Sequence, residues 1–355
     1  MTEAFRAVVT RTRPWCEPLS VAAGLEEREG ALALLSDGGP LGRWSWVAAE
    51  PDRTFVGPAG NGALLAALRD PAFATGVVGL IAYDAGARAA TGARTVVWPD
   101  LMLARYPAML GFDHERREVS AIGRGADAAA AAAAADRAEA WLDAAVDRAP
   151  PAPPAAAFEA ETPGAAYEAA VADVVARITA GELFQANIAR AWSGLLEPGA
   201  GPFDVLARLA GRASAYGAAW RLGDRAIVSN SPELFLTFDP HDGRIETRPI
   251  KGTRPRAAEA TTDAALAAEL EASAKDRAEN LMIVDLMRND LSRVARPGSV
   301  AVGRLFEIET LPTVHHLVST VTATAADGIG PADLREGRLQ QVRRGRSPAP
   351  PNIRR

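Results

Sequence analysis

Cysteine is almost absent from this chain, since Cys16 is the single one among 355 residues. One cysteine excludes an internal disulfide and any metal site built from several cysteines, and it suits a reducing compartment. Long hydrophobic runs are also absent, because no apolar stretch could span a bilayer and residues 1–10 lack the apolar segment of a signal peptide. The net charge of −5 gives no basic excess that would favour nucleic acid or an anionic membrane. We therefore expect a cytoplasmic protein that binds neither.

The composition is that of a globular protein, with 48% hydrophobic and 23% charged residues. The length allows two ordinary domains or one large domain with a deep core. Residues 150–163 are rich in proline and alanine and predict an extended linker. We expect a strand-rich region over residues 1–149, a second folded region over residues 164–333 and a tail over residues 334–355.

The first region is predicted to contain short strands, because runs of β-forming residues alternate with glycine and proline. The predicted strands are Arg6–Thr10, Ala31–Leu35, Trp44–Val47, Val77–Tyr83 and a hairpin of Met102–Phe112 with Glu118–Ile122. The alanine-dominated residues 126–146 predict a helix, since alanine has the highest helix propensity. The segment Leu34–Trp46 either forms a wall of a small-molecule pocket or is a sheet edge that carries bulky aromatic side chains.

The second region mixes predicted helices with predicted strands. Thr162 is a candidate N-cap, and Gly181 is expected to end the helix that follows. A strand predicted over Leu183–Ala189 places Gln185 and Asn187 on one face, either in a site or in solvent.

Later strands of this region are predicted to be antiparallel. Ile227–Thr237 and Arg244–Ile250 are expected to pair across a turn that contains aspartate, proline and glycine. Because regularly alternating βαβ units are missing, the sequence predicts an α+β fold.

Lys251 follows a predicted strand, precedes Gly252 and lies near Arg248, Arg254 and Arg256 in the sequence. Neighbouring cations and burial favour the neutral form of a lysine amine, which is the nucleophilic form. The same arginines would attract an anionic substrate. The alternative interpretation is a basic turn in solvent.

Asp276 and Glu279 are predicted to lie on one face at the start of a helix. Ser273 and Asp276 resemble a capping box, which predicts a helix start near residue 274. Residues 281–287 are apolar on almost every side, and a helix of this kind is expected to be buried. Carboxylates at the mouth of a buried helix suit Mg²⁺, which prefers oxygen ligands and keeps water molecules. The alternative is helix capping, worth about 0.3–1 kcal/mol through the helix dipole.

His316 lies on a strand predicted over Val314–Thr324, on the same face as Val318 and Thr320. Histidine ionises near neutral pH, so His316 is a candidate proton donor. A histidine satisfied inside a half-buried sheet is the alternative.

Four motifs occur together in this chain, and together they resemble the chorismate-utilising enzymes. The motifs are Ser229–Glu233, Arg248–Arg256, Lys275–Leu281 and Val314–Thr320. The resemblance covers most of residues 1–325, is specific over residues 162–320, and implies a large α+β sandwich of two antiparallel sheets flanked by helices. Pro249–Thr253 resembles the aminodeoxychorismate synthase branch, because the anthranilate synthase branch has alanine in place of Lys251.

The resemblance implies roles for residues near Lys251. Lys251 matches the lysine that is thought to bond to C2 of chorismate before ammonia adds at C4. His316 matches the histidine proposed to protonate the departing hydroxyl. Gly252 and Thr253 match a turn that contacts the substrate.

The resemblance also implies a metal site and a reaction type. Glu279 matches an Mg²⁺ ligand of the family, with Asp276 adjacent to that site. Gln185 stands where the isochorismate-forming branch has a lysine that activates water, which argues against hydration at C2. The implied reaction is the amination of chorismate to 4-amino-4-deoxychorismate, for para-aminobenzoate and folate synthesis. Amination by the anthranilate synthase reaction is the alternative.

Two partners follow from the resemblance. Cys16 is not part of a nucleophile elbow, so a separate glutamine amidotransferase subunit is expected to supply the ammonia. The segment Leu34–Trp46 is similar to the part of the fold that binds tryptophan.

The chain departs from the family pattern near Leu334. The family continues with a glycine-rich segment, a second Mg²⁺ carboxylate and residues that hold the substrate carboxylates. Residues 334–355 are instead rich in arginine and proline without apolar periodicity, which predicts disorder. We interpret the change as a truncation or frameshift and expect little or no turnover from this chain. The non-enzymatic alternatives are a remnant that at most binds the amidotransferase and a basic tail that binds nucleic acid.

Overall fold

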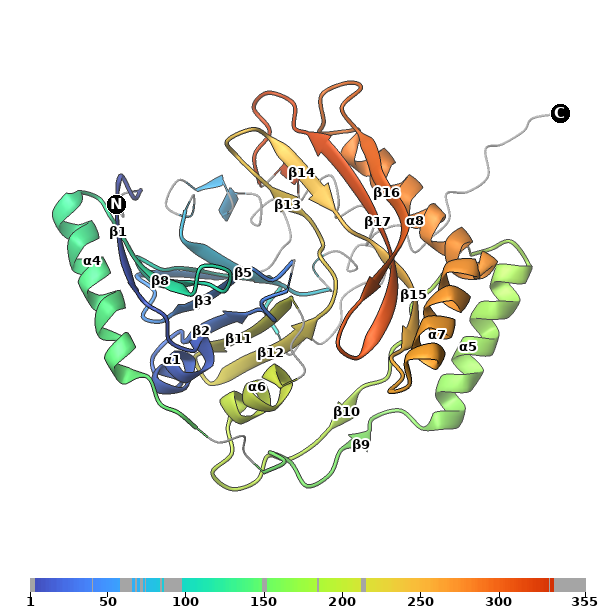
Figure 1. The fold of residues 1–355 in the computed structure, drawn as a ribbon, viewed down its shortest axis with the longest axis horizontal. Helices are drawn as coiled ribbons and strands as arrows, with labels where there is room; N and C mark the ends of the chain where they lie inside the picture. The colour runs from blue at the N-terminus through green and yellow to red at the C-terminus, as the bar shows by residue number, and fades with distance from the viewer. Residues whose placement is uncertain are drawn as a thin grey trace.

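Antiparallel β-sheets form the body of the protein, and helices cover their faces (Figure 1). The computed structural model describes residues 4–334 except residues 40, 58–65, 68, 71–72, 74, 84, 86–97, 149–151, 184, 212–214 and 332. The predicted α+β class with antiparallel sheets is confirmed. Except for Leu334, the tail predicted over residues 334–355 lies outside the described residues.

The largest sheet has seven strands and contains both early and late parts of the chain. Its order is β1 (Ala7–Pro14), β8 (Glu118–Gly125), β7 (Ala108–Asp113), β3 (Trp44–Ala48), β2 (Leu32–Leu35), β11 (Tyr216–Leu222) and β12 (Arg225–Ser231). β11 pairs with β2, so two strands that follow the proline-rich linker complete the sheet begun before it.

Helix α4 (Ala128–Ala140) packs closely on this sheet, because small residues meet on both sides. Asp127 caps the helix by accepting a hydrogen bond from the N–H of Ala130 at 2.8 Å. A Cβ on Gly123 of β8 would lie 2.0 Å from the carbonyl oxygen of Ala131. The buried Trp141 follows the helix and belongs to the main hydrophobic core.

The second large sheet lies beside helices α7 (Ala260–Ala272) and α8 (Ala274–Leu291) (Figure 1). β17 (Val314–Thr324) is its central strand, paired on one edge with β14 (Arg244–Thr247) and β15 (Ile250–Pro255) and on the other with β16 (Ala301–Thr310). β13 (Thr237–Phe238) extends the sheet beyond β14. Val284, Met287 and Leu291 of α8 form a core with Ile245 and Val321 of this sheet.

The remaining elements are smaller. They are α1 (Pro18–Leu25), α6 (Pro202–Ala210), the 3₁₀ helix η2 (Leu142–Ala144), a three-stranded sheet of β4 (Arg53–Gly57), β6 (Leu101–Arg105) and β5 (Val77–Ile81), and a ribbon of β9 (Glu159–Ala160) and β10 (Trp192–Ser193). Among the described helices, none is both long and apolar enough to pass through a membrane.

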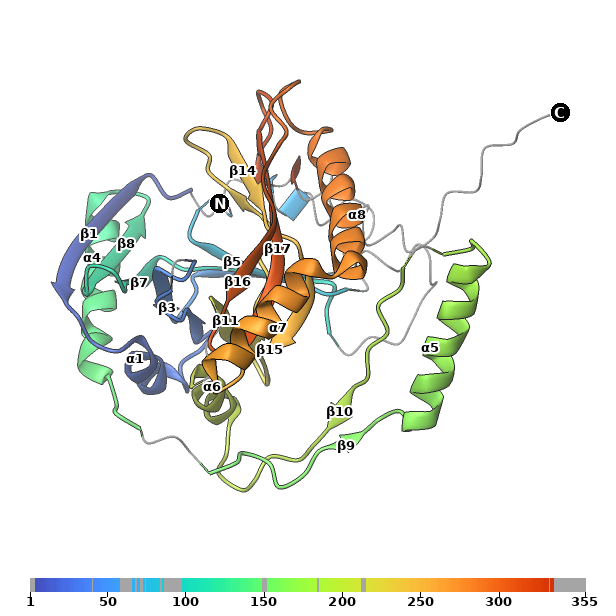
Figure 2. The same ribbon diagram turned by 45° about the vertical axis from the view of Figure 1, so that its right-hand side comes forward.

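Helix α5 (Gly164–Thr179) stands apart from the sheets, on the outer side of the molecule (Figure 2). None of its residues is buried. Gly181 adopts a φ of +75° just past the helix, as predicted for its C-terminal end. The predicted cap is one residue off, because Pro163 occupies the N-cap position and no side chain accepts a hydrogen bond there.

Two strand predictions are wrong at prolines. The predicted strand Met102–Phe112 is divided at Pro107 into β6 and β7, which belong to different sheets. The predicted strand Ile227–Thr237 is interrupted at Pro232, so that its first half pairs with β11 and its last residue belongs to β13. Proline has no N–H to donate and therefore breaks a ladder of hydrogen bonds.

Two further predictions fail for lack of a packing partner. Residues 185–189 of the predicted strand Leu183–Ala189 form no strand, since nothing in the described part of the chain pairs with them in a ladder. α8 is buried on one face rather than all round, because Leu281 is 48% exposed and Leu286 is 38% exposed.

Candidate active site

A β-bulge in β15 takes Lys251 and Gly252 out of the regular ladder. The pairing with β17 shifts register between Ile250 and Thr253, so two residues of β15 oppose a single residue of β17. A bulge leaves its extra residue unpaired and re-aims the neighbouring side chains. The bulge therefore sets the direction in which the lysine leaves the strand.

Gly252 is required at this bulge for two reasons. Its φ is +90°, which side chains with a Cβ rarely adopt. A Cβ at this position would also lie 2.8 Å from Cδ1 of Leu270 and 2.9 Å from Cβ of Asp276. The first turn of α8 thus lies directly against the bulge.

The start of α8 is fixed by the predicted cap. The Ser273 hydroxyl accepts a hydrogen bond from the N–H of Asp276 at 3.3 Å. The Asp276 carboxylate faces Nη2 of Arg254 at 3.3 Å, and its side chain is 13% exposed. The acid is therefore held between a helix cap, the bulge and an arginine.

His316 lies opposite Thr253 on the neighbouring strand, and their side chains are joined by a hydrogen bond of 2.9 Å between Nδ1 and Oγ1. The imidazole is buried, and this burial lowers the pKa of His316 below its usual value. A hydrogen bond with the backbone of Gly252 and the negative charge of Glu233 act in the opposite direction. His316 is consequently neutral near pH 7 in this state.

Glu233 also lies at the bulge, although no role is predicted for it from the sequence. Its carboxylate accepts a hydrogen bond from the N–H of Ile250 at 2.8 Å, at the start of the bulged strand. Its charge also raises the pKa of His316. One feature of the sequence could have indicated Glu233. It is an acid directly after Ser231, the last residue of β12, and Pro232, where the chain leaves the sheet.

Lys251 itself is half-buried. Within the described part of the chain, its ammonium group has no hydrogen bond or ion pair. An amine of this kind is available to an incoming molecule.

Gln185 and Glu279 lie together in a different place, in a cavity of about 550 Å³ between α5, residues 185–188 and α8. Tyr167, Val171 and Ile178 of α5 line its apolar side. The carboxylate of Glu279 is 40% exposed and faces Nζ of Lys275 at a distance of 3.9 Å. An ion pair this exposed contributes little, so the carboxylate is free to bind another group.

The predicted residues therefore fall into two groups joined by α8. Gly252, Thr253, Asp276 and His316 are in contact around the bulge that carries Lys251. The second group is Gln185 with Glu279, and the residues that line their cavity do not include the first group.

Glu279 suits Mg²⁺ better than Asp276 does. No cluster of three or more histidine, cysteine, aspartate or glutamate side chains occurs among the described residues. Mg²⁺ is often held by one or two carboxylates and keeps several waters, so Glu279 alone fits such a role. The carboxylate of Asp276 forms an ion pair with Arg254. A role for Asp276 next to the Mg²⁺ site stays a prediction.

The segment Leu34–Trp46 extends from the end of β2 to the start of β3 in the large sheet. The rings of Trp44 and Trp46 stack on each other with their centroids 5.5 Å apart. Ser45, which stands between them in the sequence, is buried, and its hydroxyl is 2.7 Å from Nε2 of His114. Tryptophan binding by this segment stays a prediction.

A sequence profile described as chorismate binding enzyme matches residues 48–337. The chain belongs to this family. The matched range contains the bulge, the start of α8 and both groups of site residues.

Named members of the family resemble most of this chain. It is 40% identical to aminodeoxychorismate synthase component 1 of Salmonella typhimurium over 274 residues, which are 75% of this chain and 57% of that protein. It is 35% identical to the protein of the same name from Escherichia coli over 290 residues, 80% of this chain and 60% of that protein. The chain thus spans 57–60% of the length of these two relatives.

A solved structure supports the fold. Anthranilate synthase component I from Streptococcus pneumoniae superposes with a TM-score of 0.69 and 23% identity, covering 84% of this chain and 72% of that one. The fold expected for chorismate binding enzymes, an α+β sandwich of antiparallel sheets, is therefore confirmed.

Proposed function

We propose that this chorismate binding enzyme acts as an aminodeoxychorismate synthase component 1, a transferase that aminates chorismate to 4-amino-4-deoxychorismate. Two relatives with this name match at least three quarters of the chain. The observation that carries the proposal is the half-buried amine of Lys251, which has no partner among the described residues and lies on a bulge that contacts Asp276 and borders the Thr253–His316 pair. The product would serve para-aminobenzoate and folate synthesis.

Lys251 is the proposed nucleophile. Its Nζ bonds to C2 of chorismate while both ring double bonds shift and the C4–O bond breaks, so that the hydroxyl takes up a proton and leaves as water. Ammonia then bonds to C4, both double bonds shift back, and the C2–Nζ bond breaks to release the lysine. A covalent intermediate of this kind divides one difficult substitution into two easier steps.

His316 is the proposed donor of the proton that the leaving hydroxyl needs. Its ring is neutral before substrate arrives, because burial lowers the pKa of this histidine. Chorismate carries two carboxylates, and negative charge near an imidazole raises its pKa. Substrate binding would therefore charge the donor, while the hydrogen bond with Thr253 holds the ring in place.

Gly252 and Thr253 are proposed to form the wall that contacts the substrate, and Gln185 is proposed to contact it from the second group of residues. Glu279 is the proposed carboxylate ligand of Mg²⁺, with Asp276 close to that site. When bound, the metal would offset negative charge on the substrate carboxylate and on the departing group.

A glutamine amidotransferase is the proposed source of ammonia. The designation component 1 of the relatives implies a second component. Cys16 is half-buried, and this burial raises the pKa of its thiol, so the reactive thiolate is disfavoured. The chain therefore has no cysteine suited to hydrolyse glutamine, and the scarcity of cysteine fits a cytoplasmic location.

The chain contains only two lysines, Lys251 and Lys275, which makes a sharp test possible. The protein is incubated with chorismate and MgCl₂ without ammonia, digested, and analysed by mass spectrometry for chorismate minus one water on each lysine. We expect the adduct on Lys251 and none on Lys275, whose side chain is 82% exposed. Equal labelling of both lysines, or no adduct, would overturn the proposal.

Product identity separates this function from the anthranilate synthase reaction. Ammonium chloride is added with the protein in excess over chorismate, so that even a slow reaction accumulates product for chromatography. We expect 4-amino-4-deoxychorismate, its loss in Lys251→Ala and its persistence in Lys275→Ala. Anthranilate as the product would assign the chain to the other reaction.

A further inference from the structure

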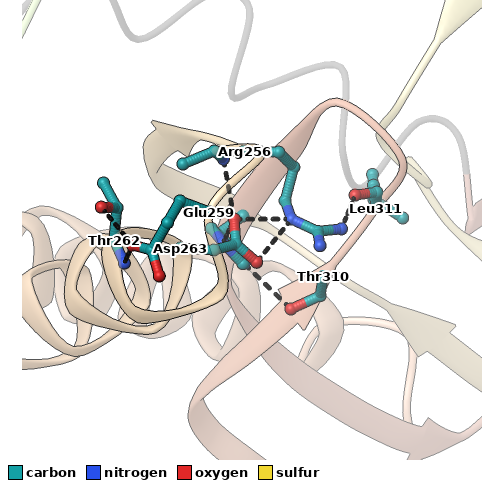
Figure 3. Close-up of polar contacts among 8 residues, drawn as sticks. Arg256, Glu259, Thr262, Asp263, Thr310 and Leu311 are labelled. Atoms are coloured by element: carbon teal, nitrogen blue, oxygen red, sulfur yellow. Dashed lines mark hydrogen bonds and ion pairs between the residues drawn. The ribbon is translucent and has the colours of Figure 1, made fainter.

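Asp263 is the centre of a polar cluster (Figure 3). Its partner His315 is adjacent to His316 on β17 and therefore lies on the opposite face of that strand. The carboxylate of Asp263 accepts hydrogen bonds from Nε of Arg256 at 2.8 and 3.0 Å and from the N–H of Ala257 at 2.9 Å. Nε2 of His315 lies 3.0 Å from the same carboxylate. The Arg256 guanidinium is the main reason why the pKa of Asp263 lies well below its usual range, so this group is an anion.

The anion decides the state of the His315 ring. Because a carboxylate only accepts hydrogen bonds, Nε2 of His315 must carry the hydrogen. Nδ1 of the same ring lies 2.9 Å from the hydroxyl of Thr310, and the two groups form a hydrogen bond. The side chain of His315 is 3% exposed, so both ring nitrogens are satisfied by protein.

Hydrogen bonds within the cluster connect four segments of the chain beside the candidate active site. Arg256 follows β15 and also donates from Nη1 to the carbonyl of Leu311, just past β16, at 2.9 Å. Asp263 belongs to α7, Thr310 ends β16 and His315 is the second residue of β17. Through Asp263, the cluster thus links the end of β15, which carries Lys251, to the start of β17, which carries His316.

The position of Asp263 is itself fixed by the cap of α7. Glu259 accepts hydrogen bonds from the N–H groups of Thr261 and Thr262 at 2.9 and 2.7 Å, and from the hydroxyl of Thr262 at 2.7 Å. Hydrogen bonds from both threonines lower the pKa of Glu259 to about 2. The carboxylates of Glu259 and Asp263 are therefore both ionised over the neutral pH range.

We propose that the Asp263–His315 pair is a positioning unit, which holds the start of β17 so that His316, the next residue, keeps its ring against Thr253. His315 and His316 point to opposite faces of the strand because they are adjacent. A rotation or slip of β17 that moved one ring would move the other. The proposed role in catalysis rests on the function proposed above for His316, whereas the positioning itself does not.

The test follows the ring nitrogens of His316 by NMR after selective ¹⁵N labelling of the four histidines. The variants are Asp263→Asn, His315→Leu and His315→Gln, where glutamine keeps a donor near the place of Nε2. The matched control is Asp285→Asn, which removes an exposed ion pair with Arg288 on α8.

We expect Asp263→Asn and His315→Leu to lose the single hydrogen-bonded tautomer of His316 and to show averaged ring signals. His315→Gln is expected to keep the wild-type His316 pattern, and so is the control. His241, in the turn before β14, should not change in any variant and serves as an internal reference. Unchanged His316 signals in folded Asp263→Asn and His315→Leu proteins would overturn the proposal.

A second measurement separates this inference from the proposed function. The rate at which the chorismate adduct forms on Lys251 in a single turnover is expected to fall about a hundredfold in Asp263→Asn, because this step needs the proton from His316 and a hundredfold loss is typical of a misplaced catalytic group. His315→Gln should recover most of that rate. If the wild-type chain forms neither adduct nor product, the proposed function fails, and the NMR comparison still decides the positioning role.

Discussion

Replacing Gly252 with alanine tests the geometry on which the candidate active site depends. The backbone there has a φ of +90°, and a residue with a Cβ loses about 1–2 kcal/mol in the left-handed region. The new methyl carbon would lie 2.8 Å from Leu270 and 2.9 and 3.0 Å from two carbons of Asp276. Overpacking of this kind costs about 1–3 kcal/mol, so we expect a total loss of about 2–5 kcal/mol.

Gly298 supplies the matched control. Its φ is +79°, but no atom lies within 4 Å of the place where a Cβ would be. Gly298→Ala should therefore lose only the backbone contribution of about 1–2 kcal/mol. The difference between the two variants isolates the contact between the bulge and the start of α8.

Urea denaturation followed by circular dichroism measures both losses. We expect a lower midpoint for both variants, a larger decrease for Gly252→Ala, and an unchanged dependence of the unfolding free energy on urea concentration. If Gly252→Ala loses no more stability than Gly298→Ala, α8 does not lie against the bulge. The placement of Gly252 against Asp276 would then be incorrect.

Three further predictions concern single groups. Burial lowers the pKa of His316, so the unfolded chain binds a proton on this histidine more readily than the folded chain does. The free energy of unfolding should therefore decrease as the pH falls below about 6.5. In urea titrations at pH 5 to 8, His316→Gln should reduce this dependence of stability on pH. Ser273→Ala removes the cap of α8 and should cost about 1 kcal/mol by the same assay, whereas Ser273→Thr should cost less. The buried hydroxyl of Tyr106 donates to the carbonyl of Gly30 and accepts from Nε1 of Trp220, so Tyr106→Phe should lose about 1–3 kcal/mol; no loss would contradict this network.

Several parts of the site could be predicted because their signals are local. The cap at Ser273 starts α8 at Ala274, as expected, because the serine and the N–H of Asp276 interact within one turn. The strand Val314–Thr324 has the predicted bounds, since β-branched and alternating side chains mark it along its whole length. The contact between Thr253 and His316 then follows from the pairing of β15 with β17.

Other parts could not be predicted, because they depend on residues far apart in the sequence. The bulge at Lys251 is a mismatch between two strands, which neither strand encodes alone. Glu233 reaches the site only because β12 ends beside Ile250 in space. Glu279 is separated from Lys251 because it lies on a face of α8 that lines the other cavity. The apolar residues spread around α8 gave no indication of which face would be buried.

The pairing of β2 with β11 connects the chain across the proline-rich linker. A protease that cuts within residues 152–163 would therefore leave two fragments that share one sheet rather than two independent domains. Such nicked protein should migrate as a single species under native conditions and separate only in denaturant. Expressing either side of the linker alone would expose a strand edge that the intact chain keeps covered.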